Sequence, residues 1–275
     1  ATLALADELA HLFDDLTTAG VPISRLDTLV PQDLDPYFQI SLEFLRIARA
    51  AFNGFLDEKG LVEPAVRRDQ LMDAEGARLA ALGAQLGRAM GPVIAAGSTG
   101  SMPATARLLR AISRLPNGAV VLPGLDQIME EDAFALLTRK ATSAPDHPQY
   151  GMARLLNTLE VTRADVVPLA SPAPYGREHL ISEVMRQAET SDLWATLPER
   201  LPAKALGEAM ARVSVVEADD PRQEALAIAL LLRETLERAD ETVALVTPDR
   251  DLARRVAAEM ARFKVKVDDS SGAPL

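Results

Sequence analysis

The residues with the clearest chemical potential form a glycine-rich loop, Gly97-Ser98-Thr99-Gly100-Ser101. The loop follows an apolar run at residues 93–96, which predicts a short buried strand. It precedes a predicted helix that starts near Pro103. Free N–H groups and the helix dipole make such loops phosphate-binding sites in nucleotide enzymes. The hydroxyls of Ser98, Thr99 and Ser101 could add hydrogen bonds to phosphate oxygens.

The same loop lacks the side chains of a catalytic nucleotide site. No lysine follows Gly100, so the sequence does not fit the P-loop pattern, and it does not fit Gly-x-Gly-x-x-Gly either. The strand before the loop carries no carboxylate that could hold a metal ion. The residues therefore favour a strand-to-helix turn built from small side chains over a phosphate-binding loop.

These residues belong to a predicted strand–helix–strand unit. Ser101 is expected to cap the helix, and residues 119–122 form a second apolar run. The two strands are expected to be parallel, with a right-handed crossover. Leu109 and Ile112 lie on the apolar side of the helix. Three arginines on another side are expected to be solvated: Arg107, Arg110 and Arg114.

The pattern of the whole chain predicts four portions. They are a helical subdomain at 1–90, a first α/β portion at 91–165, a helical connector at 166–211 and a second α/β portion at 212–275. A proline-rich stretch at 165–175 is the best candidate boundary between domains. In the last portion, apolar runs at 212–217, 242–247 and 265–267 predict strands, and residues 222–238 and 250–263 predict helices. This order is typical of a parallel sheet.

Composition excludes several classes of protein. With 275 residues and 48% hydrophobic side chains, the chain can bury a substantial core. No apolar run is long enough for a membrane span and no secretory signal is evident, so we expect a cytoplasmic protein. The absence of cysteine excludes disulfides, iron–sulfur clusters and cysteine nucleophiles from this chain. The net charge of −11 argues against a charge-driven nucleic-acid binder, although a local basic groove remains open. The two ends suggest a piece of a longer polypeptide.

Several segments resemble a known family: AAGSTGSMPATARLL, AVVLPGLD, DHPQYGMARLL, EADDPRQEALAIALLLRE, VALVTPDRDLARRVAAEM and VDDSSGAPL. Over nearly its whole length the chain resembles the AddB subunits of the bacterial AddAB helicase–nucleases, most nearly the alphaproteobacterial type. The resemblance implies a RecA-like fold related to superfamily 1 helicases, with a helical N-terminal subdomain. It also implies a role in double-strand break repair.

The resemblance further implies that the ATPase has been lost. In active relatives the matching strand ends in an Asp-Glu pair that holds Mg²⁺ and positions the attacking water. Here it ends in Ala95-Ala96-Gly97, while Asp126-Gln127 partly matches the Gly-Asp-x-x-Gln pattern after the next strand. We therefore expect no catalytic, nucleotide-binding or metal-binding residue and no cofactor in this chain. The family's iron–sulfur cluster and Mg²⁺-dependent nuclease would lie outside it.

The function implied is a non-catalytic, helicase-like scaffold that guides single-stranded DNA and docks an AddA-type motor subunit. The family also links this region to recognition of the Chi sequence. The candidate DNA-contact residues are Ser98, Thr99, Ser101, Arg250, Arg254 and Arg255. One alternative is a free-standing α/β enzyme that binds a nucleotide or phosphorylated metabolite at loop 97–101. Another, consistent with the acidic balance, is a protein-interaction module.

Overall fold

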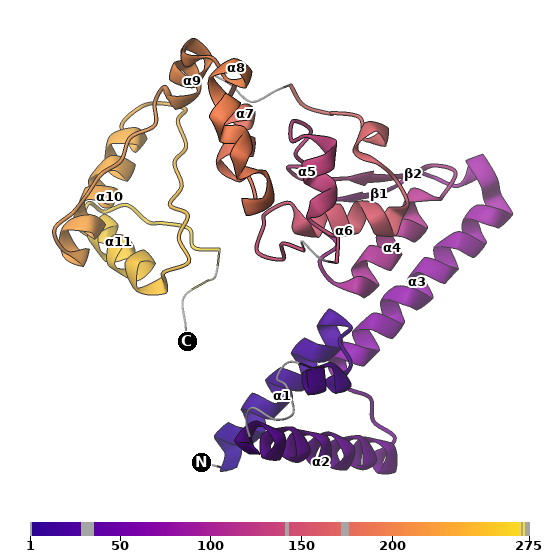
Figure 1. Cartoon of the computed structure of the whole chain (residues 1–275). Helices are drawn as coiled ribbons and strands as arrows, with labels where there is room; N and C mark the ends of the chain where they lie inside the picture. The colour runs from indigo at the N-terminus through magenta and orange to yellow at the C-terminus, as the bar shows by residue number, and fades with distance from the viewer. Residues whose placement is uncertain (1, 29–35, 141–142, 172–175, 271, 273–275) are drawn as a thin grey trace. The chain divides into compact units, whose positions relative to one another are not determined.

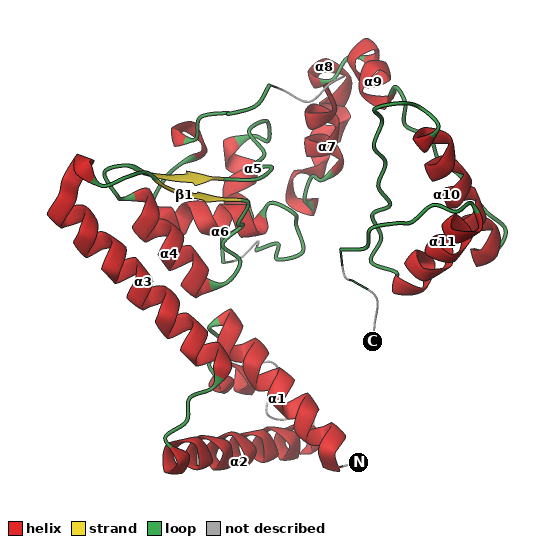
Figure 2. Ribbon diagram, turned by 180° about the vertical axis from the view of Figure 1, so that it is seen from behind, coloured by secondary structure: helices red, strands yellow, loops and turns green. Residues whose placement is uncertain are grey.

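The computed structural model describes residues 2–28, 36–140, 143–171, 176–270 and 272 (Figure 1). The chain divides into two compact units, residues 1–211 and residues 212–275, and each is described by itself. The described residues are mostly helical, and the sheet found among them has two strands (Figure 2). The predicted RecA-like parallel-sheet α/β fold is therefore wrong.

Three long helices form the predicted N-terminal helical portion. They are α1 (Thr2–Ala19), α2 (Pro36–Lys59) and α3 (Pro64–Leu86), with 3-10 turns at Ile23–Thr28 and Gly87–Ala89. Gly87 ends α3 in the left-handed region, at φ 51°, where glycine is favoured. The part of the link between α1 and α2 that contains Pro31 lies outside the described residues.

The central strand–helix–strand unit is confirmed, but its first strand is not buried as expected, since its residues alternate between half-buried and exposed and Ile94 is 64% exposed. Strands β1 (Val93–Ala96) and β2 (Gly118–Val121) are parallel, with Val93 opposite Gly118, and α4 (Pro103–Ser113) connects them. The expected helix cap at Ser101 is wrong. Met102 is the N-cap residue instead, with no side-chain cap, because α4 begins one residue later at Pro103.

Helix α4 is the centre of the first unit's core. Its residues Leu109 and Ile112 are buried, as predicted. Leu109 packs with Leu155 of α6 (Tyr150–Leu159), and Ile112 packs with Leu79 of α3. A third cluster surrounds the short helix α5 (Glu131–Leu136).

The rest of the first unit contains short helices and a buried ion cluster. The helices are α7 (Arg177–Val184), α8 (Leu197–Arg200) and α9 (Ala203–Met210), with 3-10 turns at Arg163–Asp165 and Ala188–Thr196. The buried ion cluster consists of Arg186 and Glu183, whose side chains are 2% and 11% exposed, together with their more exposed partners Glu130 and Arg200. Within the proline-rich stretch at 165–175, which was the candidate domain boundary, residues 172–175 lie outside the described residues.

The described part of the second unit has two helices, α10 (Pro221–Leu236) and α11 (Arg250–Arg262), as predicted. Asp220 and Asp249 cap them, each accepting two backbone N–H bonds at 2.8–3.1 Å. Both residues belong to the types favoured at this position, which is why the sequence located the helix starts correctly. The two helices pack through four buried residues: Ala225, Ala229, Val256 and Met260.

The strands expected at 212–217, 242–247 and 265–267 do not form within the described part of this unit. These segments are loops (Figure 2), and the side chains of Val215 and Val246 are 86% and 93% exposed. Apolar β-branched runs favour extended backbone, but a strand also needs a hydrogen-bonded neighbour. The expected second α/β portion is therefore also wrong.

Candidate functional site

The loop at 97–101 is a tight turn packed on α6. Gly97 and Gly100 have φ values of 77° and 60°, in the region that favours glycine. A Cβ atom on Gly100 would lie 2.7 Å from Cδ1 of Leu155, which is fully buried. The backbone conformation therefore favours glycine at both positions, and packing on Leu155 requires it at Gly100 as well.

The three hydroxyls of this loop have different environments. Ser98 is partly buried, and its Oγ accepts a hydrogen bond from the N–H of Gly100 at 3.3 Å. Thr99 and Ser101 are exposed just before the first turn of α4. The loop thus leaves two of its three candidate hydroxyls accessible to a phosphate.

Asp126 and Gln127, which follow β2, form hydrogen bonds with nearby backbone. Oδ1 of Asp126 accepts from the N–H groups of Ile128 and Met129 at 2.7 and 2.9 Å. Nε2 of Gln127 donates to the carbonyl of Arg163 at 3.3 Å. The pair that partly matches a helicase pattern therefore shapes the chain between β2 and α5.

Replacing Asp126 with alanine is expected to lower the free energy of unfolding by about 1–2 kcal/mol, because two N–H groups lose a charged acceptor. Urea unfolding followed by circular dichroism measures the change. Asp126→Asn is the matched control, since its amide oxygen can still accept both bonds. Equal stability of the alanine variant and the unmodified chain would contradict a structural role.

Arg163 supports this turn and was not identified from the sequence. Its side chain is buried, Nη1 donates to the carbonyl of Asp126 at 2.9 Å, and Nη2 bonds to Glu131 at 2.6 Å. Its guanidinium lies 4.4 Å from the centre of the Phe134 ring. Because Glu131 lies 32 positions away in the chain, no local pattern could have indicated this contact.

Both ring nitrogens of His147 form hydrogen bonds with backbone groups. Its Nε2 lies 2.6 Å from the carbonyl oxygen of Met185, and its Nδ1 accepts from the N–H of Gln149 at 3.1 Å. Gln149 in turn bonds to the chain after β2, donating to the carbonyl of Gly124 and accepting from the N–H of Asp126. The ring of His147 therefore holds neighbouring backbone segments in place.

The arginines of α4 connect it to neighbouring elements. Arg107 forms two bonds of 2.8 Å with Asp73 of α3, and these hydrogen bonds hold the pKa of Asp73 below its ordinary value. Arg110 and Arg114 both pair with Glu160 at the end of α6. Exposed pairs of this kind contribute little to stability, and they occupy the side of α4 expected to be solvated.

The other three candidate DNA-contact residues, Arg250, Arg254 and Arg255, lie on helix α11. Arg250 makes two bonds with Asp269, at 3.1 and 3.0 Å, and these raise its pKa. Arg254 pairs with Asp251 one turn away, and Arg255 is exposed. Arg254 and Arg255 are therefore more accessible to an anionic ligand than Arg250, which is held in a two-bond ion pair.

Arg250 also lines a groove of about 740 Å³ in the second unit. The groove lies among α10, α11 and the loops at 243–248 and 265–270, and Val256 and Met260 contribute apolar surface to it. Asp269 and Lys266 line it too. Its lining is thus mixed in charge, without the uniformly basic character expected of a phosphate-binding groove.

No family model, curated protein or solved structure matches this chain. The described residues contain no group of three or more His, Asp or Glu side chains arranged to hold a metal ion. None of the helices in the described ranges has the length and apolar content that a membrane span requires.

Proposed function

We propose that this chain is a non-catalytic scaffold within an AddB-type subunit of a helicase–nuclease, where it guides single-stranded DNA and docks an AddA-type motor subunit. One observation carries the non-catalytic part. Strand β1 ends in Ala95 and Ala96, which carry no carboxylate. The side chains of Asp126 and Gln127 form hydrogen bonds with backbone groups of this chain. Where a motor would place metal-binding carboxylates, these residues have structural roles. The RecA-like fold is not part of this proposal.

Four accessible side chains support the DNA-guiding part. The hydroxyls of Thr99 and Ser101 and the guanidinium groups of Arg254 and Arg255 are exposed. Such groups contact phosphate oxygens without reading the base sequence. Because the chain has a net charge of −11, the expected binding is weak and confined to local positive sites.

The arginine contribution is tested with the double variant Arg254→Glu/Arg255→Glu. We expect the dissociation constant for a fluorescein-labelled oligo(dT) of 15 nucleotides, measured by anisotropy at low salt, to rise about tenfold. The dependence of log K on log salt should become shallower by about 0.7 for each phosphate that the variant no longer binds. Arg262→Glu is the matched control, because Arg262 is also exposed and paired three residues away on α11. It should bind as the unmodified chain does.

The other possible results of these experiments distinguish the proposed scaffold from the alternative enzyme. Absence of oligo(dT) binding, or an equal loss in the Arg262→Glu control, would contradict the proposed contact surface. Mg²⁺-dependent turnover of ATP by the unmodified chain would overturn the non-catalytic role. If Thr99→Ala/Ser101→Ala then abolished that turnover, the loop would be a nucleotide site, as the alternative enzyme hypothesis requires.

A further inference from the structure

Helix α2 exposes a continuous row of large apolar side chains, which we name the α2 stripe: Ile40, Phe44, Ile47 and Phe55. Their exposed fractions are 67%, 46%, 61% and 51%. At about 100° per residue, the four side chains fall within about 80° of the helix circumference, and they span about 22 Å. Ala51 lies on the same side and is also exposed.

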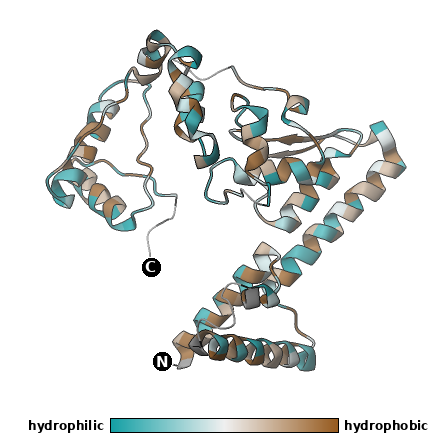
Figure 3. Cartoon of the chain, in the orientation of Figure 1, coloured by the Kyte–Doolittle hydropathy of each residue, from teal (hydrophilic) through white to brown (hydrophobic). Residues whose placement is uncertain are grey.

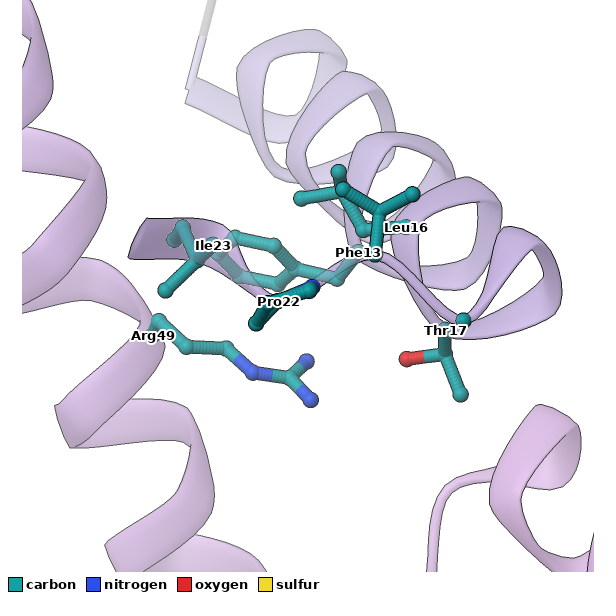
Figure 4. Close-up of a pocket in the computed structure, with 8 residues that line it drawn as sticks. Phe13, Leu16, Thr17, Pro22, Ile23 and Arg49 are labelled. Carbon is teal, nitrogen blue, oxygen red and sulfur yellow. The ribbon is translucent and has the colours of Figure 1, made fainter. Parts of the chain in front are cut away.

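The opposite side of α2 is the one that packs within its own unit. Leu42 is buried, and Phe52 stacks on Phe13 of α1 with ring centres 6.2 Å apart. Arg49 bonds to Glu63 at 2.9 Å and lies 4.9 Å from the centre of the Phe13 ring. Figure 4 shows Phe13 and Arg49 lining a small pocket of about 320 Å³ on this side. The α2 stripe is therefore separate from the core contacts of α2.

The side chains of the α2 stripe recur regularly along one side of a helix, unlike apolar residues that are scattered singly over a surface. Single exposed apolar residues are common on protein surfaces, but contiguous apolar patches mark interaction sites. Hydrophobic residues recur along α2 between hydrophilic ones (Figure 3). Ile40, Phe44 and Ile47 lie at positions i, i+4 and i+7, which is the pattern by which one helix packs against another.

The net charge of the N-terminal segment that contains the α2 stripe distinguishes the possible partners. Residues 1–62 carry ten acidic and four basic side chains. Helix α1 has four carboxylates and no lysine or arginine: Asp7, Glu8, Asp14 and Asp15. Like charges oppose binding of a second copy, of nucleic acid or of an anionic membrane, whereas opposite charges favour association with a basic partner.

We infer that the α2 stripe docks a basic amphipathic helix of a partner protein. A helix of about 15 residues covers its length of about 22 Å. The partner's apolar residues would lie against Phe44 and Ile47. Its flanking lysines or arginines would compete with Arg46 and Lys59, which pair with the exposed carboxylates of Glu43 and Glu58 in the free chain. This inference does not depend on the proposed function, since none of its residues belongs to the candidate DNA-contact set.

Two synthetic peptides of 15 residues test the inference. Both place leucine at i, i+4, i+7 and i+11, and they carry either lysine or glutamate at the polar positions. We expect the lysine peptide to bind the full chain, measured by isothermal titration, and the glutamate peptide not to bind. The triple variant Ile40→Ser/Phe44→Ser/Ile47→Ser should bind the lysine peptide at least about tenfold more weakly. Leu71→Ser is the control, because Leu71 is an exposed leucine of α3 outside the α2 stripe.

The variants must retain the helical circular dichroism of the unmodified chain, which is expected because all three replaced side chains are exposed. If the triple variant unfolds, the single variant Ile47→Ser takes its place. We expect it to bind the lysine peptide about threefold more weakly than the unmodified chain does. Equal binding by the stripe variants and the Leu71→Ser control would overturn the inference. So would a dimer, detected by sedimentation, that the triple variant abolishes, because the α2 stripe would then bind a second copy. Binding to anionic vesicles with no binding of the lysine peptide would assign it to a membrane surface instead.

Discussion

Replacing Glu183 with alanine is expected to lower the free energy of unfolding by about 3–5 kcal/mol, because it leaves a buried arginine without its principal partner. The side chain of Arg186 is only 2% exposed and bonds to Glu183 at 2.9 and 2.8 Å. Glu130 would remain as its carboxylate partner, at 2.7 Å, but the Glu130 side chain is 42% exposed and is shared with Arg200. Urea unfolding at neutral pH measures the loss.

Two further variants separate this effect from a general loss of charge. Glu75→Ala removes an exposed partner of Arg78 and should leave the unfolding midpoint unchanged. The double variant Glu183→Leu/Arg186→Met should be more stable than Glu183→Ala, because an apolar pair carries no desolvation penalty. Wild-type stability of Glu183→Ala would contradict the view that the buried ion cluster holds this part of the unit together.

The difference in stability between the unmodified chain and Glu183→Ala is expected to depend on pH. The hydrogen bonds from Arg186, followed by those from Arg200, hold the pKa of Glu183 below its ordinary value of 4.5. A depressed pKa means that the stabilisation is fully present above pH 4.5 and is lost as the pH falls through the folded-state value. The difference in stability between the unmodified chain and Glu183→Ala should therefore narrow in acid and stay constant from pH 6 to 8.

Local signals in the sequence were enough to predict most helices and the unit β1–α4–β2. Asp220 and Asp249 each precede an amphipathic segment and cap it in the structure. The apolar run at 93–96 and the following glycine loop correctly indicated a strand and a turn. These features depend on residues within a few positions of one another, so periodicity and capping chemistry contain the needed information.

The number of paired strands and the roles of the site residues could not be predicted in this way. An apolar run such as 242–247 has the same composition whether or not a neighbouring strand pairs with it, and here no pairing forms among the described residues. Likewise Arg163 and Arg107 find their partners 32 and 34 positions away. Asp126 appeared to be a remnant of a catalytic pattern, yet its carboxylate accepts two N–H bonds from residues directly after it.

Replacing Gly118 with alanine is the second change with a large expected effect. The added Cβ atom would lie 1.9 Å from the carbonyl oxygen of Ile112 and 2.9 Å from Cβ of Leu115. Both neighbours belong to the end of α4 and the turn after it, and both residues are buried. Because the nearest atom is backbone, a change of side-chain rotamer cannot relieve the contact, and we expect a loss of about 3 kcal/mol or more.

The glycine at this position is also expected to set the register of the sheet. Gly118 is paired with Val93 at the start of both strands. A shift of β2 away from α4 would disturb all four paired positions, and a two-stranded sheet has no further strand to hold it in place. Hydrogen exchange of Gly118→Ala should therefore show faster exchange in β1 and β2 together, while α10 and α11 of the second unit keep the protection of the unmodified chain.

The matched control is Gly91→Ala, two residues before β1. A Cβ atom there has no neighbour within 4 Å, and Gly91 does not have a positive φ. It should unfold at the same urea concentration as the unmodified chain, which isolates the contact with α4 from the general effect of removing a glycine. If Gly118→Ala kept both its stability and its strand protection, the close contact between β2 and α4 could not be what sets the register. The loop at 97–101 would then have to be positioned by its packing on Leu155 alone.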